Sequence, residues 1–140
     1  MMRYVVFRSK PRFLRRLVGD SQGSAVAEFV MITTLLVLIA MTLIQLALVL
    51  HVRNTLIDAA SNGAHYGALA NRSSADAQDR TQRLIAESLH AGFAGNVGVQ
   101  TAQIGESQVI TVSVDTRVPL IGLLPNGWDL HVQGEAVKYG

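Results

Sequence analysis

The sequence contains no cysteine, which excludes a disulfide framework, a thiol nucleophile and any cysteine-based metal site. No Ser/His/Asp arrangement and no pair of catalytic carboxylates is visible, and the chain outside its apolar run is too short for an obvious active-site cleft. We therefore expect no enzyme activity, cofactor, metal or small-molecule substrate. The histidines support this expectation because they lie far apart and lack the spacing of metal ligands: His51, His65, His90 and His131.

Charged residues are also scarce, at 16%, whereas hydrophobic residues reach 49%. One apolar run, residues 29–50, largely explains this skew. A helix of about 22 residues reaches about 33 Å, enough to cross a hydrocarbon core of about 30 Å. The run is too long for a cleaved secretory signal, whose apolar region has about 7–15 residues. A chain of 140 residues could hardly bury a helix that is apolar all round. We therefore predict a transmembrane helix over residues 24–50.

The basic residues are concentrated ahead of this run. From Ser24 onward, acids outnumber cations by nine to six, and only Arg53 closely follows the run. Basic clusters can bind nucleic acid, but beside a hydrophobic span they are more typical of a cytosolic flank. We expect a cytosolic N-terminus, an extracytoplasmic C-terminal body, membrane lipid as a partner and no nucleic acid. Six of the twelve cations precede the run: Arg3, Arg8, Lys10, Arg12, Arg15 and Arg16.

No proline occurs within residues 51–72, so the helix is expected to continue outside the membrane over this stretch. Small side chains recur along it every four positions, and small residues let another backbone approach closely. Two interpretations remain open. The small residues pack against the protein's own sheet, or they pack against helices of other subunits in an assembly. They form two rows: Ala59, Gly63 and Gly67, and Ala60, Ala64 and Ala68.

Residues 73–140 have the pattern of a small α+β domain. Ser73 and Asp76 fit a capping box, followed by an amphipathic helix over residues 75–90. Alternation with period two predicts about three antiparallel strands, near 97–104, over 107–118 and from Trp128 onward. The outer half of the long helix is expected to cover this sheet. The side chains predicted to face inward are Ile110, Val112, Val114, Val118, Trp128, Leu130 and Val132.

The uncharged run at residues 120–124 does not fit this alternation. It lies between two predicted strands and beside a proline. Its leucines and isoleucine form either a buried corner or an exposed contact patch, and the sequence favours neither. The candidate patch consists of Leu120, Ile121, Leu123 and Leu124.

Glu28 stands at the start of the apolar run, where an ionised side chain is unfavourable. Gly23, four further residues and then Glu28-Phe29, placed behind a basic leader and against a span, resemble a prepilin peptidase site. This resemblance implies a prepilin peptidase as a partner and cleavage between Gly23 and Ser24. Residues 1–23 would then be a leader, and Glu28 would be the fifth residue of the mature chain.

More of the sequence resembles the TadE-like proteins, which are minor pilin-like components of the bacterial tight-adherence (Flp) pilus. The resemblance rests on "GSAVAEF", the long span, "VRNTLIDAASNGAHYGALA", a short helix and a strand-rich tail with "VPLIGLLPNGW". It extends essentially over residues 23–140. It implies a pilin-like fold in the inner membrane, with other pilin-like subunits and the pilus assembly platform as partners. Some members carry cysteines in the strand region, and this chain has none.

A physical reason for Glu28 follows from this resemblance. Cleavage would create an α-amine on Ser24, and Glu28 could pair with that amine in its own helix or in a neighbouring one. A desolvated ammonium–carboxylate pair favours one register, because leaving either charge unpaired is costly. The alternative is a carboxylate that simply reaches the lipid headgroups. A separate alternative for the function is an unprocessed single-pass scaffold or sensor whose outer domain binds a partner.

Overall fold

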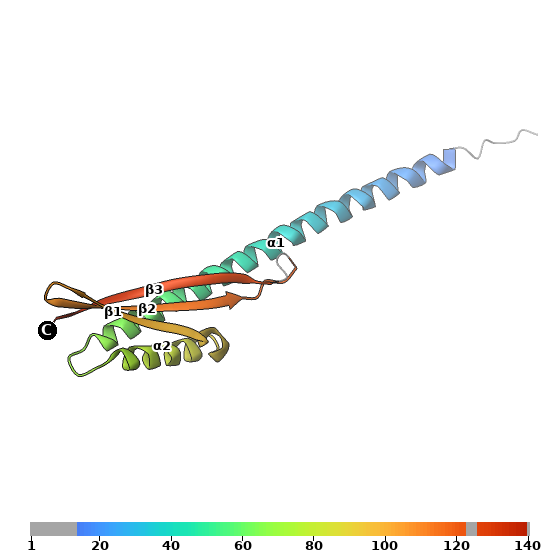
Figure 1. Ribbon diagram of the computed structural model, residues 1–140. Helices are drawn as coiled ribbons and strands as arrows, with labels where there is room; N and C mark the ends of the chain where they lie inside the picture. The colour runs from blue at the N-terminus through green and yellow to red at the C-terminus, as the bar shows by residue number, and fades with distance from the viewer. Residues whose placement is uncertain (1–13, 123–125, 140) are drawn as a thin grey trace, which may run out of the picture. The chain divides into compact units, whose positions relative to one another are not determined.

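The computed structural model describes residues 14–122 and 126–139. The chain divides into two compact units, Met1–Thr42 and Leu43–Gly140, and each is described by itself. The elements confirm the α+β class predicted from the sequence (Figure 1). In chain order they are the helix α1 (Leu14–Gly67), the helix α2 (Ser74–Ser88), the 3-10 helix η1 (Ala91–Ala94) and the strands β1 (Asn96–Ile104), β2 (Ser107–Val118) and β3 (Trp128–Tyr139).

The described side chains of α1 in the first unit, those of residues 21–42, are mostly apolar and uncovered. Residues 21–42 are all exposed. Within Ser21–Gly67 the helix is long and apolar enough to cross a membrane, with a mean hydropathy of 2.6 in its most apolar window of 18 residues. Threonines fit this helix because their hydroxyls donate back to carbonyls one turn earlier: Thr34 Oγ1 lies 2.7 Å from Val30 O, and Thr42 Oγ1 lies 2.8 Å from Leu38 O. The long apolar helix fits a single-pass membrane protein.

The second unit is built on a three-stranded antiparallel sheet in the order β1-β2-β3. Its alternation matches the sequence prediction, because the side chains expected to face inward from β2 are buried. The register places Val114 opposite Val97 on one side and Val132 on the other. β3 continues to Tyr139, well beyond its last predicted inward residue, because β2 offers it a partner along its whole length.

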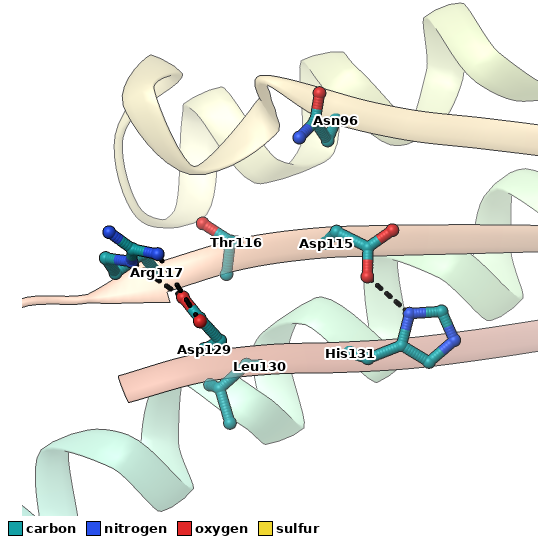
Figure 2. Close-up of a pocket in the computed structure, with 7 residues that line it drawn as sticks. All are labelled: Asn96, Asp115, Thr116, Arg117, Asp129, Leu130 and His131. Carbon is teal, nitrogen blue, oxygen red and sulfur yellow. Dashed lines mark hydrogen bonds and ion pairs between the residues drawn. The ribbon is translucent and has the colours of Figure 1, made fainter. Parts of the chain in front are cut away.

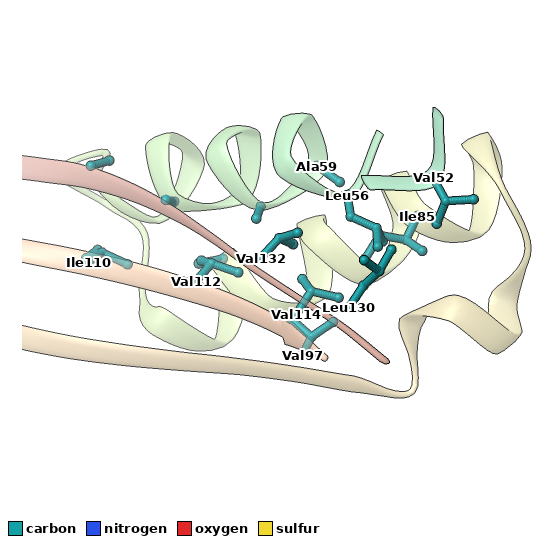
Figure 3. Close-up of a cluster of buried hydrophobic side chains, with 14 of the residues drawn as sticks. Val52, Leu56, Ala59, Ile85, Val97, Ile110, Val112, Val114, Leu130 and Val132 are labelled. Atoms are coloured by element: carbon teal, nitrogen blue, oxygen red, sulfur yellow. The ribbon is translucent and has the colours of Figure 1, made fainter. Parts of the chain in front are cut away.

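The outer part of α1 completes the core of this unit (Figure 3). Val52 and Leu56 of α1 meet Ile85 of α2 and the inward valines of the sheet in one cluster. Leu56 and Ile85 are fully buried. Burying such a side chain contributes about 1.5–3 kcal/mol to the free energy of folding. The outer part of α1 therefore stabilises the unit, and the inner part of the same helix contains the predicted span. The prediction that the outer half of the helix covers the sheet is confirmed.

The prediction that Trp128 belongs to the core is wrong, because its side chain is 51% exposed. It has the inward parity of Leu130 and Val132, but it is the first residue of β3 and pairs with Val118 at the end of the sheet. Only half of its surface is covered by described residues at that end. Periodicity predicts the face on which a side chain lies, but not whether a neighbouring element reaches it.

Candidate functional site

The predicted processing residues lie together on the exposed first part of α1. Ser24 and Glu28 are four residues apart, so they share one helix face. Glu28 is exposed and forms no ion pair with a described residue. Phe29 is 69% exposed. A Cβ added to Gly23 would meet nothing within 4 Å, so the fold of the described residues does not require a glycine there.

The two rows of small residues are buried within the second unit. Four of the six residues are buried hydrophobics or lie beside them: Ala59, Ala60, Ala64 and, partly buried, Ala68. A Cβ added to Gly63 would lie 2.8 Å from Ala77 O of α2, and one added to Gly67 would lie 2.6 Å from the Ala77 Cβ. Packing within the chain therefore accounts for these surfaces. The helix that they meet is α2, in addition to the sheet that the sequence suggested.

The helix α2 begins with the capping box that was predicted from the sequence. Ser73 Oγ accepts from the Asp76 backbone N–H at 3.4 Å, and Asp76 Oδ2 accepts from the Ser73 N–H at 2.8 Å. These hydrogen bonds hold the pKa of Asp76 below its ordinary value, the backbone bond from Ser73 being the main cause. The buried residues of α2 are Ala77, Thr81 and Ile85, spaced four apart on the face toward α1.

A shallow pocket of about 520 Å³ lies on the outer face of the sheet, where β2 and β3 bring charged residues together (Figure 2). Arg117 Nε donates to Asp129 Oδ1 at 2.6 Å across the two strands. This bond lowers the pKa of Asp129 and raises that of Arg117. Further along the same face, Asp115 contacts the Nδ1 of His131.

The chemistry of this pocket is that of paired surface charges. Two residue pairs across β2 and β3 each place an acid opposite a base. They are Asp115 with His131 and Asp129 with Arg117. The other ring nitrogen of His131, Nε2, lies 3.0 Å from Gln133 Nε2, so neither ring nitrogen contacts a hydroxyl nucleophile among the described residues. Exposed cross-strand pairs of this kind contribute little to stability and help to fix register.

No group of three or more His, Asp or Glu side chains in the described part of the chain could hold a metal ion. The candidate contact patch is only partly described. Leu120 is half-buried and Ile121 is 80% exposed. Leu123 and Leu124 lie outside the described residues, as does most of the basic leader.

Sequence reasoning missed the role of Gln45, a polar residue within the apolar run. Its side chain is 7% exposed, and its Nε2 donates to the backbone carbonyl of Ile121. A lone amide in an apolar run was the available signal, because a buried amide needs a hydrogen-bond partner. The partner lies 76 positions away in sequence, so only the structure reveals it.

The family model for TadE-like proteins matches residues 23–65. No curated protein and no solved structure gives a match. The match begins at the glycine of the predicted processing site and contains Glu28, the whole apolar run and most of the small-residue rows. It is shorter than the expected range of 23–140, and α2 and the sheet fall outside it. The resemblance inferred from the sequence is confirmed over residues 23–65, where the chain is similar to TadE-like proteins.

Proposed function

We propose that this protein is a pilin-like structural or assembly component of a tight-adherence (Flp) pilus. It is inserted in the bacterial cytoplasmic membrane with a cytosolic N-terminus, and a prepilin peptidase processes it between Gly23 and Ser24. The single observation that carries the proposal is the TadE-like match, which associates the chain with the Tad pilus and begins at Gly23.

The surroundings of Gly23 support a processing role. Glycine in a helix interior costs about 1 kcal/mol relative to alanine. No described neighbour needs the space that a Cβ would fill, so packing does not explain this residue. A site of low helix propensity opens more easily than the helix around it, and a peptidase needs an accessible backbone at the bond that it cuts.

Glu28 supports an assembly role. The carboxylate is exposed on an apolar helix and has no cationic partner among the described residues. An unpaired carboxylate beside an apolar span favours a state in which a cationic group pairs with it. The α-amine of a processed Ser24, in the same helix or a neighbouring one, is that partner. The pair forms in the membrane, where the chain meets other subunits of the pilus and the assembly platform.

Processing is tested with Gly23→Leu, which places a bulky side chain beside the scissile bond. The full-length chain should accumulate in the membrane with its leader attached, whereas wild type should be shortened to begin at Ser24. Intact-mass measurement with and without a co-expressed prepilin peptidase distinguishes the two forms. Ala40→Leu adds a similar side chain to an exposed position of the same helix and should be processed normally.

Assembly is tested with Glu28→Ala and Glu28→Gln, which both remove the charge. Membrane insertion should be equal or better, cleavage at Gly23 should continue, and piliation should fail because the Ser24 amine lacks its partner. Electron microscopy and shear-fraction blots measure the pili. A native protein that still begins at Met1 or Met2, with pili unaffected by either variant, would favour the unprocessed scaffold or sensor instead.

A further inference from the structure

The turn that joins β2 to β3 is attached to the helix at Gln45, shortly before the apolar run ends. Gln45 donates to Ile121 O, and both residues belong to the second unit. Twenty helical residues cross a hydrocarbon core of about 30 Å, so a span counted from Ala25 is complete near Ile44. The apolar run ends five residues beyond Gln45, at Leu50, which is about 7.5 Å further along the helix.

The residues at this attachment are apolar, and much of their surface is uncovered. Ile121 is 80% exposed and Trp128, where β3 begins, is 51% exposed. The helix beside them is equally uncovered, with Ile44 64% exposed. No charged side chain occurs between Arg117 and Asp129, and those two residues pair with each other. Exposed apolar side chains thus occur on both sides of this attachment, on the helix at Ile44 and on the sheet side at Ile121 and Trp128.

We propose that Ile121 and Trp128 rest on the outer leaflet of the membrane, so that the domain has a second lipid contact besides its span. The proposal rests on the membrane span of the proposed function. Tryptophan is enriched at membrane interfaces, where its ring meets both lipid and water. Non-helical backbone at this depth must find hydrogen-bond partners within the protein. Gln45 provides such a partner for the Ile121 carbonyl, which also explains why an amide is present in an apolar run.

The rest of the domain extends away from this contact. β3 follows α1 outward, because Gly134 approaches Ala60 and Ser61, and the Nζ of Lys138 donates to Arg72 O at 2.9 Å (Figure 1). Ser61 lies 16 residues, or about 24 Å, further along the helix than Gln45. The two ends of β3 are therefore at very different heights along the helix. Only the end that carries Trp128 is level with the end of the apolar run.

Trp128 is the single tryptophan of the chain, so the native protein contains its own probe. The full-length protein is reconstituted in vesicles of phosphatidylethanolamine and phosphatidylglycerol that contain lipids spin-labelled near the headgroup or near the chain end. Trp128 should lose more fluorescence to the shallow label than to the deep label. In the double variant Trp128→Phe/Tyr139→Trp, neither label should quench, because Tyr139 is at the far end of β3 and 80% exposed.

A second pair of variants tests the contact itself. Ile121→Asp should reduce quenching of Trp128 by the shallow label, because a charge in the turn opposes contact with lipid. Ile121→Val should leave the quenching unchanged. The side chain is exposed, so neither substitution disturbs the core.

The outcomes separate this proposal from the proposed function. The double variant Trp128→Phe/Phe29→Trp reports on the span, and quenching there without quenching of Trp128 overturns the lipid contact while the span stands. Absence of quenching at both positions overturns the span and the contact together. If Trp128 is shielded from aqueous iodide but quenched by neither lipid label, a protein covers it, and the proposal is wrong.

Discussion

At the scale of single residues, Gly134 marks the closest approach between β3 and α1. A Cβ at this position would collide with the backbone of Ala60 and Ser61. Backbone atoms of a helix cannot move aside as the end of a flexible side chain can, so glycine is the residue that fits. The sequence offered only a glycine that interrupts an alternating strand.

Gly134→Ala should therefore lower the free energy of unfolding by more than about 1 kcal/mol, because β3 must move away from the helix to make room. Chemical denaturation followed by circular dichroism measures the loss. Gly95→Ala is the matched control, since Gly95 has a φ of −63° and its added Cβ would lie 3.8 Å from Gly92 O, an ordinary contact. Equal stability of the two variants would show that the helix and strand are less closely packed than described.

The sequence predicts the burial of some single residues but not the contacts of others. The alternation in β2 was sufficient to predict that Val112 and Val114 are buried, because a half-buried strand repeats every two residues. It could not predict the exposure of Trp128, which depends on how far another element extends. It also could not pair Gln45 with Ile121, because a hydrogen bond between distant segments leaves no local pattern in the sequence.

At the scale of elements, α2 was predicted closely because its signals are local. The capping box and the spacing of apolar residues are contained in about fifteen residues, and the predicted start at residue 75 compares with Ser74 in the structure. The predicted end at residue 90 was late, because His90 instead caps η1, its Nδ1 accepting from Gly92 N–H at 3.1 Å. No end was predicted for β3, because Gly134 lies at an inward position and interrupts the apolar alternation there.

The capping box gives α2 a pH dependence. Hydrogen bonds from Ser73 lower the pKa of Asp76 in the folded protein, so its contribution to stability is present above its ordinary value of 3.8. That contribution is lost as the pH falls through the lower folded pKa. Wild type should therefore be more stable than Asp76→Asn at neutral pH, and the difference should shrink in strong acid. Thermal unfolding at a series of pH values measures it; a difference independent of pH would contradict the capping role.

Ser73→Ala tests the other half of the same box. Loss of an N-cap side chain costs about 1 kcal/mol. The helix should fray at its first turn, and amide hydrogen exchange should accelerate at Asp76, whose N–H donates to Ser73 Oγ. Ser73→Asp keeps an acceptor at the cap and should retain most of the protection. Unchanged exchange in Ser73→Ala would mean that the Asp76 side chain alone holds the turn.

At the scale of the whole molecule, the core of the second unit begins with the helix outside the predicted span. Its first buried hydrophobic residue along the chain is Val52. A fragment of residues 51–140 should therefore fold and unfold cooperatively in detergent-free buffer, although its exposed apolar turn should limit its solubility. Leu56→Ala in this fragment should cost about 2–5 kcal/mol, because the side chain is fully buried. A fragment with no cooperative transition would show that the span is needed for folding.

The order of the elements along the chain also determines when each one is synthesised. The segment of α1 around Ala60 is made well before the strand that approaches it at Gly134. Ribosomes add about 5–20 residues per second, so roughly seventy residues of synthesis separate the two and take several seconds. Throughout that interval, the apolar face of α1 has no β3 to cover it. Until β3 is made, this apolar face of the nascent chain is exposed to contacts that favour aggregation.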